Sequence, residues 1–256
     1  MLLAIDVGNT AITIGVFRED TLVASWRLAT DTSRLPDEYA ALLLNLLDHE
    51  GLEPSELDAA AMCSVVPDME QAFREVCGRY LNLKPLVVEA GVRTGLRILY
   101  DSPRDVGADR VVDAVAAVHM YGTPLIIVDL GTATVFDAIN REGEYLGGAI
   151  APGVGIGAEA LFQRAAKLYR VEMSKPQSAI GRNTVAALQS GIVFGNIGLI
   201  EGMVSRFKEE LGDDAKVIAT GGYAELLAES TGIVDHINPN LTLQGLRLIY
   251  EMNRGA

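Results

Sequence analysis

One short pattern occurs twice in this chain, about half its length apart. Each copy has an apolar segment that ends in an aspartate and continues through a glycine-containing polar turn into a second apolar segment. The first copy covers residues 4–10 and the second 127–133, so Asp6 and Asp129 are 123 positions apart in a chain of 256. Because Asp, Gly, Asn and Thr favour turns between apolar strands, both copies predict a β-hairpin with a polar tip. The repeat therefore predicts two related halves.

The residues at the two tips are suited to binding phosphate. Glycine lets the backbone approach phosphate oxygens and present its N–H groups, and Thr and Asn side chains add further donors. An aspartate beside them can hold a cation against the same phosphates. One copy alone describes an ordinary hairpin turn equally well, but two copies at half-chain spacing favour a pair of loops that bind one nucleotide.

Strand and helix patterns alternate along the chain, which is typical of an α/β fold. After the first hairpin, the predicted strands cover 21–28, 59–65, 85–89, 125–129, 134–140, 145–150 and 216–219. The predicted helices cover 67–80, 108–121, 155–168 and 184–211, and others begin at Pro36, Tyr223 and Thr242. Segment 91–104 is predicted to be a loop that carries Tyr100. We expect two mixed-sheet domains, 1–118 and 119–256, with the last helix able to pack back on the first.

The net charge of the chain is −13 and its isoelectric point is near 4.7. This acidity argues against a nucleic-acid partner or an anionic membrane surface, since both need clustered Lys and Arg. The most apolar helical segment, 190–204, is interrupted by Asn196 and Glu201 and is too short for a bilayer core of about 30 Å. No basic segment or cleavage site is recognisable at the beginning of the chain. We therefore expect a cytoplasmic protein with neither a nucleic-acid nor a membrane partner.

The few cysteine and histidine residues suggest no metal centre. Cys63 and Cys77 form no closely spaced pair, so we predict buried reduced thiols rather than a zinc site or a disulfide. The three histidines are far apart in the sequence, and none lies beside a candidate nucleophile.

A stripe of four glycines marks the long predicted helix 184–211. These residues are spaced so that they share one face of the helix: Gly191, Gly195, Gly198 and Gly202. A glycine inside a helix costs about 1 kcal/mol relative to alanine, so a compensating contact is expected there. Two interpretations remain open, a dimer interface and close packing against another part of the same chain.

The beginning of the predicted helix 108–121 carries an acid and a fixed cation side by side. Free N–H groups and the helix dipole favour anions at this position. Asp109 could accept a proton from an attacking hydroxyl group, and Arg110 could bind a substrate carboxylate through two hydrogen bonds. Asp is also common in the first turn of ordinary helices, and this simpler explanation stays open.

Four motifs of the chain occur in an order that identifies a family. They are DVGNT at 6–10, GADR at 107–110, DLGTAT at 129–134 and GGAIAPG at 147–153. In order and spacing, and over essentially the whole chain, they resemble the type III pantothenate kinases. That family belongs to the superfamily of acetate and sugar kinases, heat-shock chaperones and actin. The resemblance implies an α/β fold of two duplicated mixed-sheet domains of the actin-like ATPase (ribonuclease H-like) type, with a nucleotide cleft between them.

The resemblance also implies an activity, ATP-dependent phosphorylation of pantothenate to 4'-phosphopantothenate, the first step of coenzyme A biosynthesis. It implies Mg²⁺ with the ATP, an activating monovalent cation (K⁺ or NH₄⁺) and a homodimer. The implied ATP-binding residues are Asp6, Val7, Gly8, Asn9, Thr10, Ala11, Ile12, Thr13 and Thr132. Asp109 matches the catalytic base, and the implied pantothenate-binding residues are Tyr100, Gly107, Ala108, Asp109, Arg110 and Thr184, the last reaching the pocket from the partner subunit. Asp129 matches the residue that binds the monovalent cation.

Two positions depart from the family pattern. Ala11 stands where asparagine is more frequent, and Val135 where a second threonine is frequent. Both adjoin the phosphate loops, but neither carries a catalytic role. The glycines at 153, 155 and 157 lack the spacing of a dinucleotide-binding fingerprint and are interpreted as a tight turn into a helix.

Two alternative functions remain open from the sequence. One is a kinase of the same superfamily that acts on a sugar or another small hydroxy acid. The other is a nucleotide-binding regulatory protein, because related sequences have been described as accessory factors for transcription, and a fold alone does not determine a function.

Overall fold

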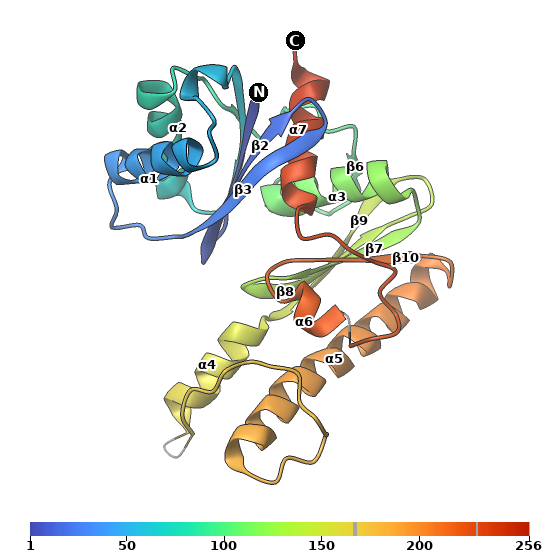
Figure 1. Ribbon diagram of the computed structural model, residues 1–256. Helices are drawn as coiled ribbons and strands as arrows, with labels where there is room; N and C mark the ends of the chain where they lie inside the picture. The colour runs from blue at the N-terminus through green and yellow to red at the C-terminus, as the bar shows by residue number, and fades with distance from the viewer. Residues whose placement is uncertain (166–167, 229, 256) are drawn as a thin grey trace. The chain divides into compact units, whose positions relative to one another are not determined.

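Two mixed β-sheets, one in each of two structural units, organise the chain (Figure 1). The computed structural model describes residues 1–165, 168–228 and 230–255. The first unit consists of Met1–Gly95, Ser102–Ala116 and Leu241–Ala256, and the second of Leu96–Asp101 and Ala117–Asn240. The predicted domain ranges 1–118 and 119–256 stay a prediction.

The sheet of the first unit has five strands in the order β3-β2-β1-β4-β5. The strands are β1 (Leu2–Val7), β2 (Ala11–Arg18), β3 (Thr21–Ala29), β4 (Ala59–Ser64) and β5 (Leu86–Val87). The first three form an antiparallel meander, whereas β4 runs parallel to both β1 and β5. In this register Asp6 is paired with Thr13 on one side and with Cys63 on the other.

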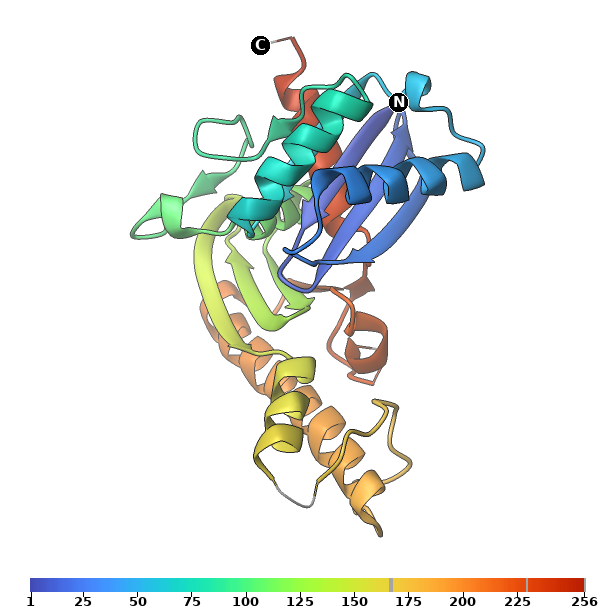
Figure 2. The same ribbon diagram turned by 90° about the vertical axis from the view of Figure 1, so that its left-hand side faces the viewer.

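Helices cover both faces of this sheet. α1 (Pro36–His49) and α2 (Pro67–Tyr80) lie on one face, and α7 (Leu241–Asn253) lies on the other (Figure 2). The alternation of side chains along β2 explains the two layers, since Ile14 belongs to the core beneath α1 and α2 while Gly15 contacts Leu243 of α7. A short 3₁₀ turn, η1 (Pro54–Glu56), lies between α1 and β4, and another, η2 (Pro103–Asp105), precedes the helix that begins at Ala108.

The last helix packs on the first unit because a glycine lets it approach closely. α7 lies against β1, β2 and β4 and against the beginning of α3 (Ala108–Tyr121). A Cβ atom on Gly245 would overlap the backbone of Val112, so any larger residue would push the two helices apart.

The sheet of the second unit has the order β11-β10-β7-β8-β9-β6. Its strands are β6 (Arg97–Ile98), β7 (Leu125–Leu130), β8 (Ala133–Ile139), β9 (Glu144–Pro152), β10 (Lys216–Thr220) and β11 (His236–Ile237). The helices of this unit are α4 (Val154–Arg164), α5 (Thr184–Leu211) and α6 (Ala224–Ala228). α5 crosses one face of the sheet (Figure 1), where the rings of Phe136 and Phe207 lie 6.0 Å apart.

The two sheets share one topology. In each, a central strand (β1 or β7) is antiparallel to the strand that follows it and parallel to a later strand (β4 or β10). The order β3-β2-β1-β4-β5 is thus repeated as β9-β8-β7-β10-β11, with β6 added at one edge. The predicted α/β class with a mixed sheet in each half is confirmed.

Several predicted boundaries were wrong. The helix predicted for 155–168 begins at Val154 and ends at Arg164, because Ala165 leaves the helical conformation; positions 166 and 167 of that prediction lie outside the described residues. The strand predicted for 85–89 is reduced to β5. Segment 91–104 was predicted to be a loop but contains β6 and the start of η2, and β11 was not predicted. Two-residue strands have no periodicity in the sequence, so only pairing with a neighbouring strand defines them.

The structure also tests the predictions for the cysteines and for the apolar helix. Cys63 and Cys77 are buried free thiols, as predicted. Among the described helices, α5 alone is long and apolar enough to cross a membrane by length and composition. Core helices of globular proteins pass the same test, and α5 contributes Val193, Ile200 and Val204 to the core of the second unit.

Candidate active site

The first of the two loops predicted to bind phosphate, residues 8–10, connects β1 to β2 and leaves its tip exposed. A hydrogen bond from the Gly8 N–H to the Ala11 carbonyl oxygen, 3.0 Å long, closes the turn. Asn9 and Thr10 are exposed at the tip, whereas Asp6 lies below it near the end of β1 and is partly buried. The predicted ATP-binding segment therefore runs from the end of one buried strand to the beginning of the next.

Asp6 is a carboxylate in an unfavourable environment. The thiol of Cys63 donates a hydrogen bond to its Oδ1, with a sulfur–oxygen distance of 3.4 Å. Burial, and then the negative charge of Asp109, raise the pKa of Asp6 from 3.8 to about 7, and the bond from Cys63 opposes this rise. A cation bound beside Asp6 would offset both the cost of burying its negative charge and the repulsion from Asp109.

Cys63 itself stays protonated. Burial, followed by the charges of Asp6 and Asp109, raises the pKa of its thiol well above the ordinary value. The thiol is therefore a hydrogen-bond donor at this site and not a nucleophile.

Asp113 is an acid that sequence reasoning missed. It is buried, lies one helical turn after Asp109 on α3, and its charge also acts on Cys63. The spacing of four residues from Asp109 was the available signal, because residues i and i+4 share one helix face.

The predicted catalytic residue lies at the beginning of α3. Oδ1 of Asp109 accepts a hydrogen bond from the backbone N–H of Arg110, 2.8 Å away. A Cβ atom on Gly107 would lie only 2.5 Å from the same oxygen, so glycine is required for this side-chain position. Gly107, Ala108, Asp109 and Arg110 thus belong to the same unit as Asp6, and Asp109 is close enough to Asp6 to perturb it electrostatically.

The second phosphate loop has the same construction with one residue fewer. The Gly131 N–H donates to the Ala133 carbonyl oxygen at 3.0 Å, and Thr132 alone occupies the tip. Asp129, near the end of β7, corresponds to Asp6, and its register partner on the parallel strand β10 is Thr220. The Asp129 carboxylate packs against the backbone of the loop, since a Cβ on Gly131 would lie 3.3 Å from its Oδ1.

Two further glycines enclose the second loop, and neither was among the predicted site residues. Gly221, in the turn after β10, has φ +91° and leaves no room for a Cβ beside Asp129. Gly153, which immediately precedes α4, would place a Cβ on the carbonyl groups of Gly131 and Thr132. Their sequence signal was glycine next to a strand end, which also describes ordinary turns.

The two remaining predicted substrate residues lie far apart in the second unit. The ring of Tyr100 packs on Gly147 of β9, and Gly147 lines a surface pocket together with Phe207, near the end of α5. Thr184 is exposed at the start of α5, next to Asn183, whose side chain caps the helix by accepting the Ala186 N–H at 2.9 Å. Since α5 rises about 1.5 Å per residue, roughly 35 Å separate Thr184 from Phe207. One small substrate cannot contact Tyr100 and Thr184 of the same chain.

The donor chemistry of the site suits a phosphate-bound metal ion. Among the described residues, no three His, Cys, Asp or Glu side chains are grouped so that they could hold a metal ion. Mg²⁺ in nucleotide sites is commonly held by one or two carboxylates, substrate phosphates and water. Asp6 beside an exposed glycine turn matches that arrangement.

Comparison with known proteins identifies the family. The family model of the type III pantothenate kinases matches residues 2–206. A type III pantothenate kinase of Roseiflexus sp. (strain RS-1) is 52% identical over 254 residues, which are 99% of this chain and 100% of that protein. This chain belongs to the type III pantothenate kinase family. The family identified from the sequence motifs is therefore confirmed.

Solved structures share the fold at low sequence identity. One is a Campylobacter jejuni protein described provisionally as a Baf family transcriptional activator, with a TM-score of 0.64, 17% identity, and coverage of 99% of this chain and 100% of that chain. Another is the ethanolamine utilization protein EutJ of Carboxydothermus hydrogenoformans, with a TM-score of 0.54, 18% identity, and coverage of 96% and 89%. At such identities the likeness shows the fold alone, which is that of the predicted actin-like class.

Replacing Asp6 by asparagine should remove one pH dependence of stability. The pKa of Asp6 is about 7 in the folded protein, whereas the ordinary value of 3.8 applies to the unfolded chain. Between these two values the folded protein keeps a proton that the unfolded chain loses. This contribution to stability is complete below about pH 4 and is lost as the pH rises through about 7. Between about pH 5 and pH 8, the free energy of unfolding of Asp6→Asn should rise by on the order of 2 kcal/mol relative to that of the wild type, allowing for solvent screening. Urea unfolding of both proteins at the two pH values measures this change. A stability difference between variant and wild type that is the same at both pH values would contradict the prediction.

A matched pair of glycine variants tests the second loop. Gly153→Ala should destabilise the protein by about 1–3 kcal/mol and weaken ATP binding, because the new methyl group displaces the loop carbonyl groups. Gly157→Ala, in α4 with no described atom within 4 Å of the new methyl group, should be neutral or stabilising by up to about 1 kcal/mol. Thermal unfolding and ATP titration of both variants measure the contrast. Equal effects of the two variants would show that the second loop does not need a glycine at position 153.

Proposed function

We propose that this protein transfers the γ-phosphoryl group of ATP to the primary hydroxyl of pantothenate and so forms 4'-phosphopantothenate, the first step of coenzyme A biosynthesis. The observation that carries this proposal is the position of Asp109. It lies at a helix start, beside Arg110, and within electrostatic reach of Asp6 at the first phosphate loop, in a chain that belongs to the type III pantothenate kinases.

ATP is held by the two phosphate loops. Residues Asp6 to Thr13 of the first loop and Thr132 of the second are the residues that contact the phosphates of ATP. Backbone N–H groups at the glycine turns and the hydroxyl groups of Thr10 and Thr132 are the donors. Asp6 would hold Mg²⁺, directly or through water, and the ion would supply positive charge beside the phosphates.

Asp109 is the general base. Its carboxylate accepts the proton of the pantothenate hydroxyl as the oxygen attacks the γ-phosphorus, while the N–H of Arg110 keeps one carboxylate oxygen in place. The Arg110 guanidinium binds the pantothenate carboxylate. Phosphoryl transfer passes through a loose transition state, so alignment and electrostatics supply most of the rate and proton acceptance adds to it.

Asp129 would hold the activating monovalent cation, K⁺ or NH₄⁺. Its carboxylate is enclosed by the backbone of Gly131 and Gly221, and oxygen donors of this kind suit hard cations. A cation there would contribute positive charge near the phosphates bound by the second loop.

The active form is a homodimer in which Thr184 completes the pantothenate site of the partner subunit. The separation of roughly 35 Å along α5 between Thr184 and the Tyr100 region supports this assignment, because it excludes a shared site within one chain. Gly191, Gly195 and Gly198 are exposed, and no described atom lies within 4 Å of a Cβ added at any of them. Packing within one chain therefore does not explain them, which favours the dimer interpretation.

The alternative functions are less well supported. A kinase for another small hydroxy acid or a sugar would use the same loops, and only a panel of substrates distinguishes it. A regulatory role is suggested by the name given to the Campylobacter jejuni protein, but that likeness concerns the fold. The net charge of −13 supports a cytoplasmic enzyme without a nucleic-acid or membrane partner.

The kinase proposal predicts that ADP release depends on pantothenate and on potassium. Purified protein with MgATP should release ADP only when pantothenate is present, and faster with potassium than with sodium. Asp109→Asn should lower kcat by about 10²–10⁴-fold, because the base is lost, while ATP binding is kept. Coupled ADP detection and ATP titration measure both. ATP binding without pantothenate-dependent turnover would contradict the substrate assignment, and wild-type turnover by Asp109→Asn would contradict the base.

The dimer proposal is tested by two glycine-to-arginine variants. Gly195→Arg should shift the protein from dimer to monomer and abolish turnover, because a long charged side chain would lie in the interface that brings Thr184 to the partner. Gly78→Arg, in α2 and likewise without a described atom within 4 Å, is the control and should remain an active dimer. Analytical ultracentrifugation at micromolar concentration gives the oligomeric state. A wild type that is monomeric and active would contradict the proposal.

A further inference from the structure

Thr30, the first residue after β3, makes two hydrogen bonds to the first phosphate loop. Its hydroxyl group donates to the carbonyl oxygen of Gly8 at 2.7 Å. Its backbone N–H donates to the carbonyl oxygen of Thr10 at 3.1 Å. Both acceptors belong to the four-residue turn, Gly8 to Ala11, that carries the exposed tip, so this turn is bonded to a residue about twenty positions away in the sequence.

The planarity of the peptide bond gives these contacts a consequence for the opposite side of the loop. In a trans peptide the carbonyl of one residue and the N–H of the next point in opposite directions. With the Gly8 carbonyl directed at Thr30, the N–H of Asn9 is directed away from Thr30. The same holds for the N–H of Ala11, which follows the Thr10 carbonyl. Thr30 therefore helps to determine the direction in which the loop presents backbone donors.

Thr30 is itself held on both sides by a buried tyrosine. The hydroxyl group of Tyr39 accepts the N–H of Asp31 at 2.9 Å and can donate its proton to the carbonyl oxygen of Asp31 (3.1 Å) or of Ala29 (3.3 Å). The side chain of Tyr39 is fully buried in the core of the first unit, with its ring 5.2 Å from that of Phe73. A phenol anchored in the core thus fixes the two residues that flank Thr30.

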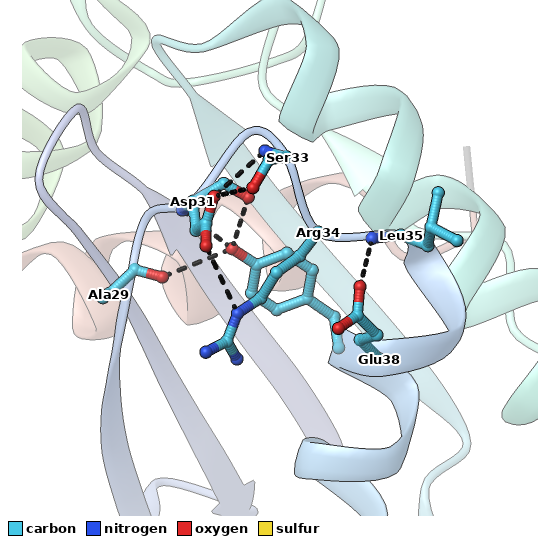
Figure 3. A network of polar contacts seen from close by, with 7 residues as sticks. Ala29, Asp31, Ser33, Arg34, Leu35 and Glu38 are labelled. Carbon is cyan, nitrogen blue, oxygen red and sulfur yellow. Dashed lines mark hydrogen bonds and ion pairs between the residues drawn. The ribbon is translucent and has the colours of Figure 1, made fainter.

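The residues after Thr30, Asp31 to Arg34, form a polar turn that leads to α1 (Figure 3). The carboxylate of Asp31 accepts hydrogen bonds from the hydroxyl group of Ser33 at 2.6 Å and from its N–H at 3.0 Å, and the guanidinium of Arg34 lies 3.6 Å away. The Ser33 hydroxyl, then its N–H and the charge of Arg34, lower the pKa of Asp31, so the turn persists at neutral pH. The side chain of Glu38, in the first turn of α1, accepts the N–H of Leu35 at 2.8 Å.

The second loop is supported in a different way. Its carbonyl groups at Gly131 and Thr132 lie against Gly153, where the absence of a side chain makes the contact possible. The first loop instead depends on a side-chain hydroxyl group. A substitution that removes only that hydroxyl is therefore a selective test of the first loop.

We propose that Thr30 is a positioning residue that orients the first phosphate loop for ATP, through its hydrogen bonds to the Gly8 and Thr10 carbonyl groups. This inference rests on the proposed function only in taking ATP as the ligand of the loop. Thr30 itself does not touch the reacting atoms.

The test compares three variants by direct titration with MgATP and by steady-state kinetics. Thr30→Val keeps the shape of the side chain but removes the hydroxyl group. The loss of one such bond should weaken MgATP binding and raise the KM for ATP by about tenfold, with the KM for pantothenate unchanged. Thr30→Ser keeps a hydroxyl group and should bind ATP within about twofold of the wild type. Thr21→Val, at the exposed opposite end of β3, is the control and should behave as the wild type.

Thermal unfolding of every variant separates loop orientation from general stability. If Thr30→Val folds and binds MgATP as the wild type does, the proposal is wrong. If Thr30→Val does not fold, Tyr39→Phe replaces it. That variant frees the residues flanking Thr30 and should weaken MgATP binding in the same direction, and unchanged binding would overturn the proposal.

Failure of the kinase proposal gives a different result. A wild type that binds MgATP but does not turn over pantothenate would contradict the substrate assignment. The MgATP titrations of the Thr30 variants would then still decide whether Thr30 orients the loop. A wild type that does not bind MgATP would overturn both.

Discussion

The pairing of each central strand with one antiparallel and one parallel neighbour is the constraint on which the rest of the structure depends. A hairpin must turn at the carboxyl end of the central strand, and the parallel neighbour ends at the same edge. Asp6 and Asp129 are therefore each placed beside a glycine turn and beside a residue of the parallel strand, Cys63 or Thr220. Ligands commonly bind at this edge of open α/β sheets. The fold thus produces the same arrangement twice: an aspartate beside a glycine turn and a residue of the parallel strand. Each of these two arrangements is called a polar corner.

The two corners differ in charge and in support. In the first unit the charges of Asp6, Asp109 and Asp113 all act on the protonated thiol of Cys63, and burial together with the charge of Asp109 disfavours the ionised form of Asp6. Acidic groups with pKa values perturbed in this way are often found at functional sites. The second corner encloses a single aspartate with glycine backbone. The carbonyl groups of the first loop accept hydrogen bonds from Thr30, whereas those of the second loop lie against Gly153.

Local patterns predicted much of this structure, and long-range contacts account for what was missed. Helix α5 was predicted with correct limits because twenty-eight residues of helical pattern lie between Asn183 and Gly212. The hairpins at Asp6 and Asp129 were predicted because turn residues separate two apolar segments. The two-residue strands β6 and β11 and the end of α4 were missed, since pairing and packing with distant residues define them. Gly221 and Thr30 were missed for the same reason, because each acts on a loop far away in the sequence.

The sequence by itself determined the family, the α/β class, the duplicated hairpins and the identity of the residues at their tips. These features follow from local periodicity, turn chemistry and motifs that are contiguous along the chain. Only the tertiary structure decided that Cys63 donates to Asp6, that Asp109 perturbs the same carboxylate, that Gly153 supports the second loop, and that Thr30 holds the first. The reason is physical: hydrogen bonds, burial and charge repulsion depend on distances in space, and those distances are set by strand register and helix packing.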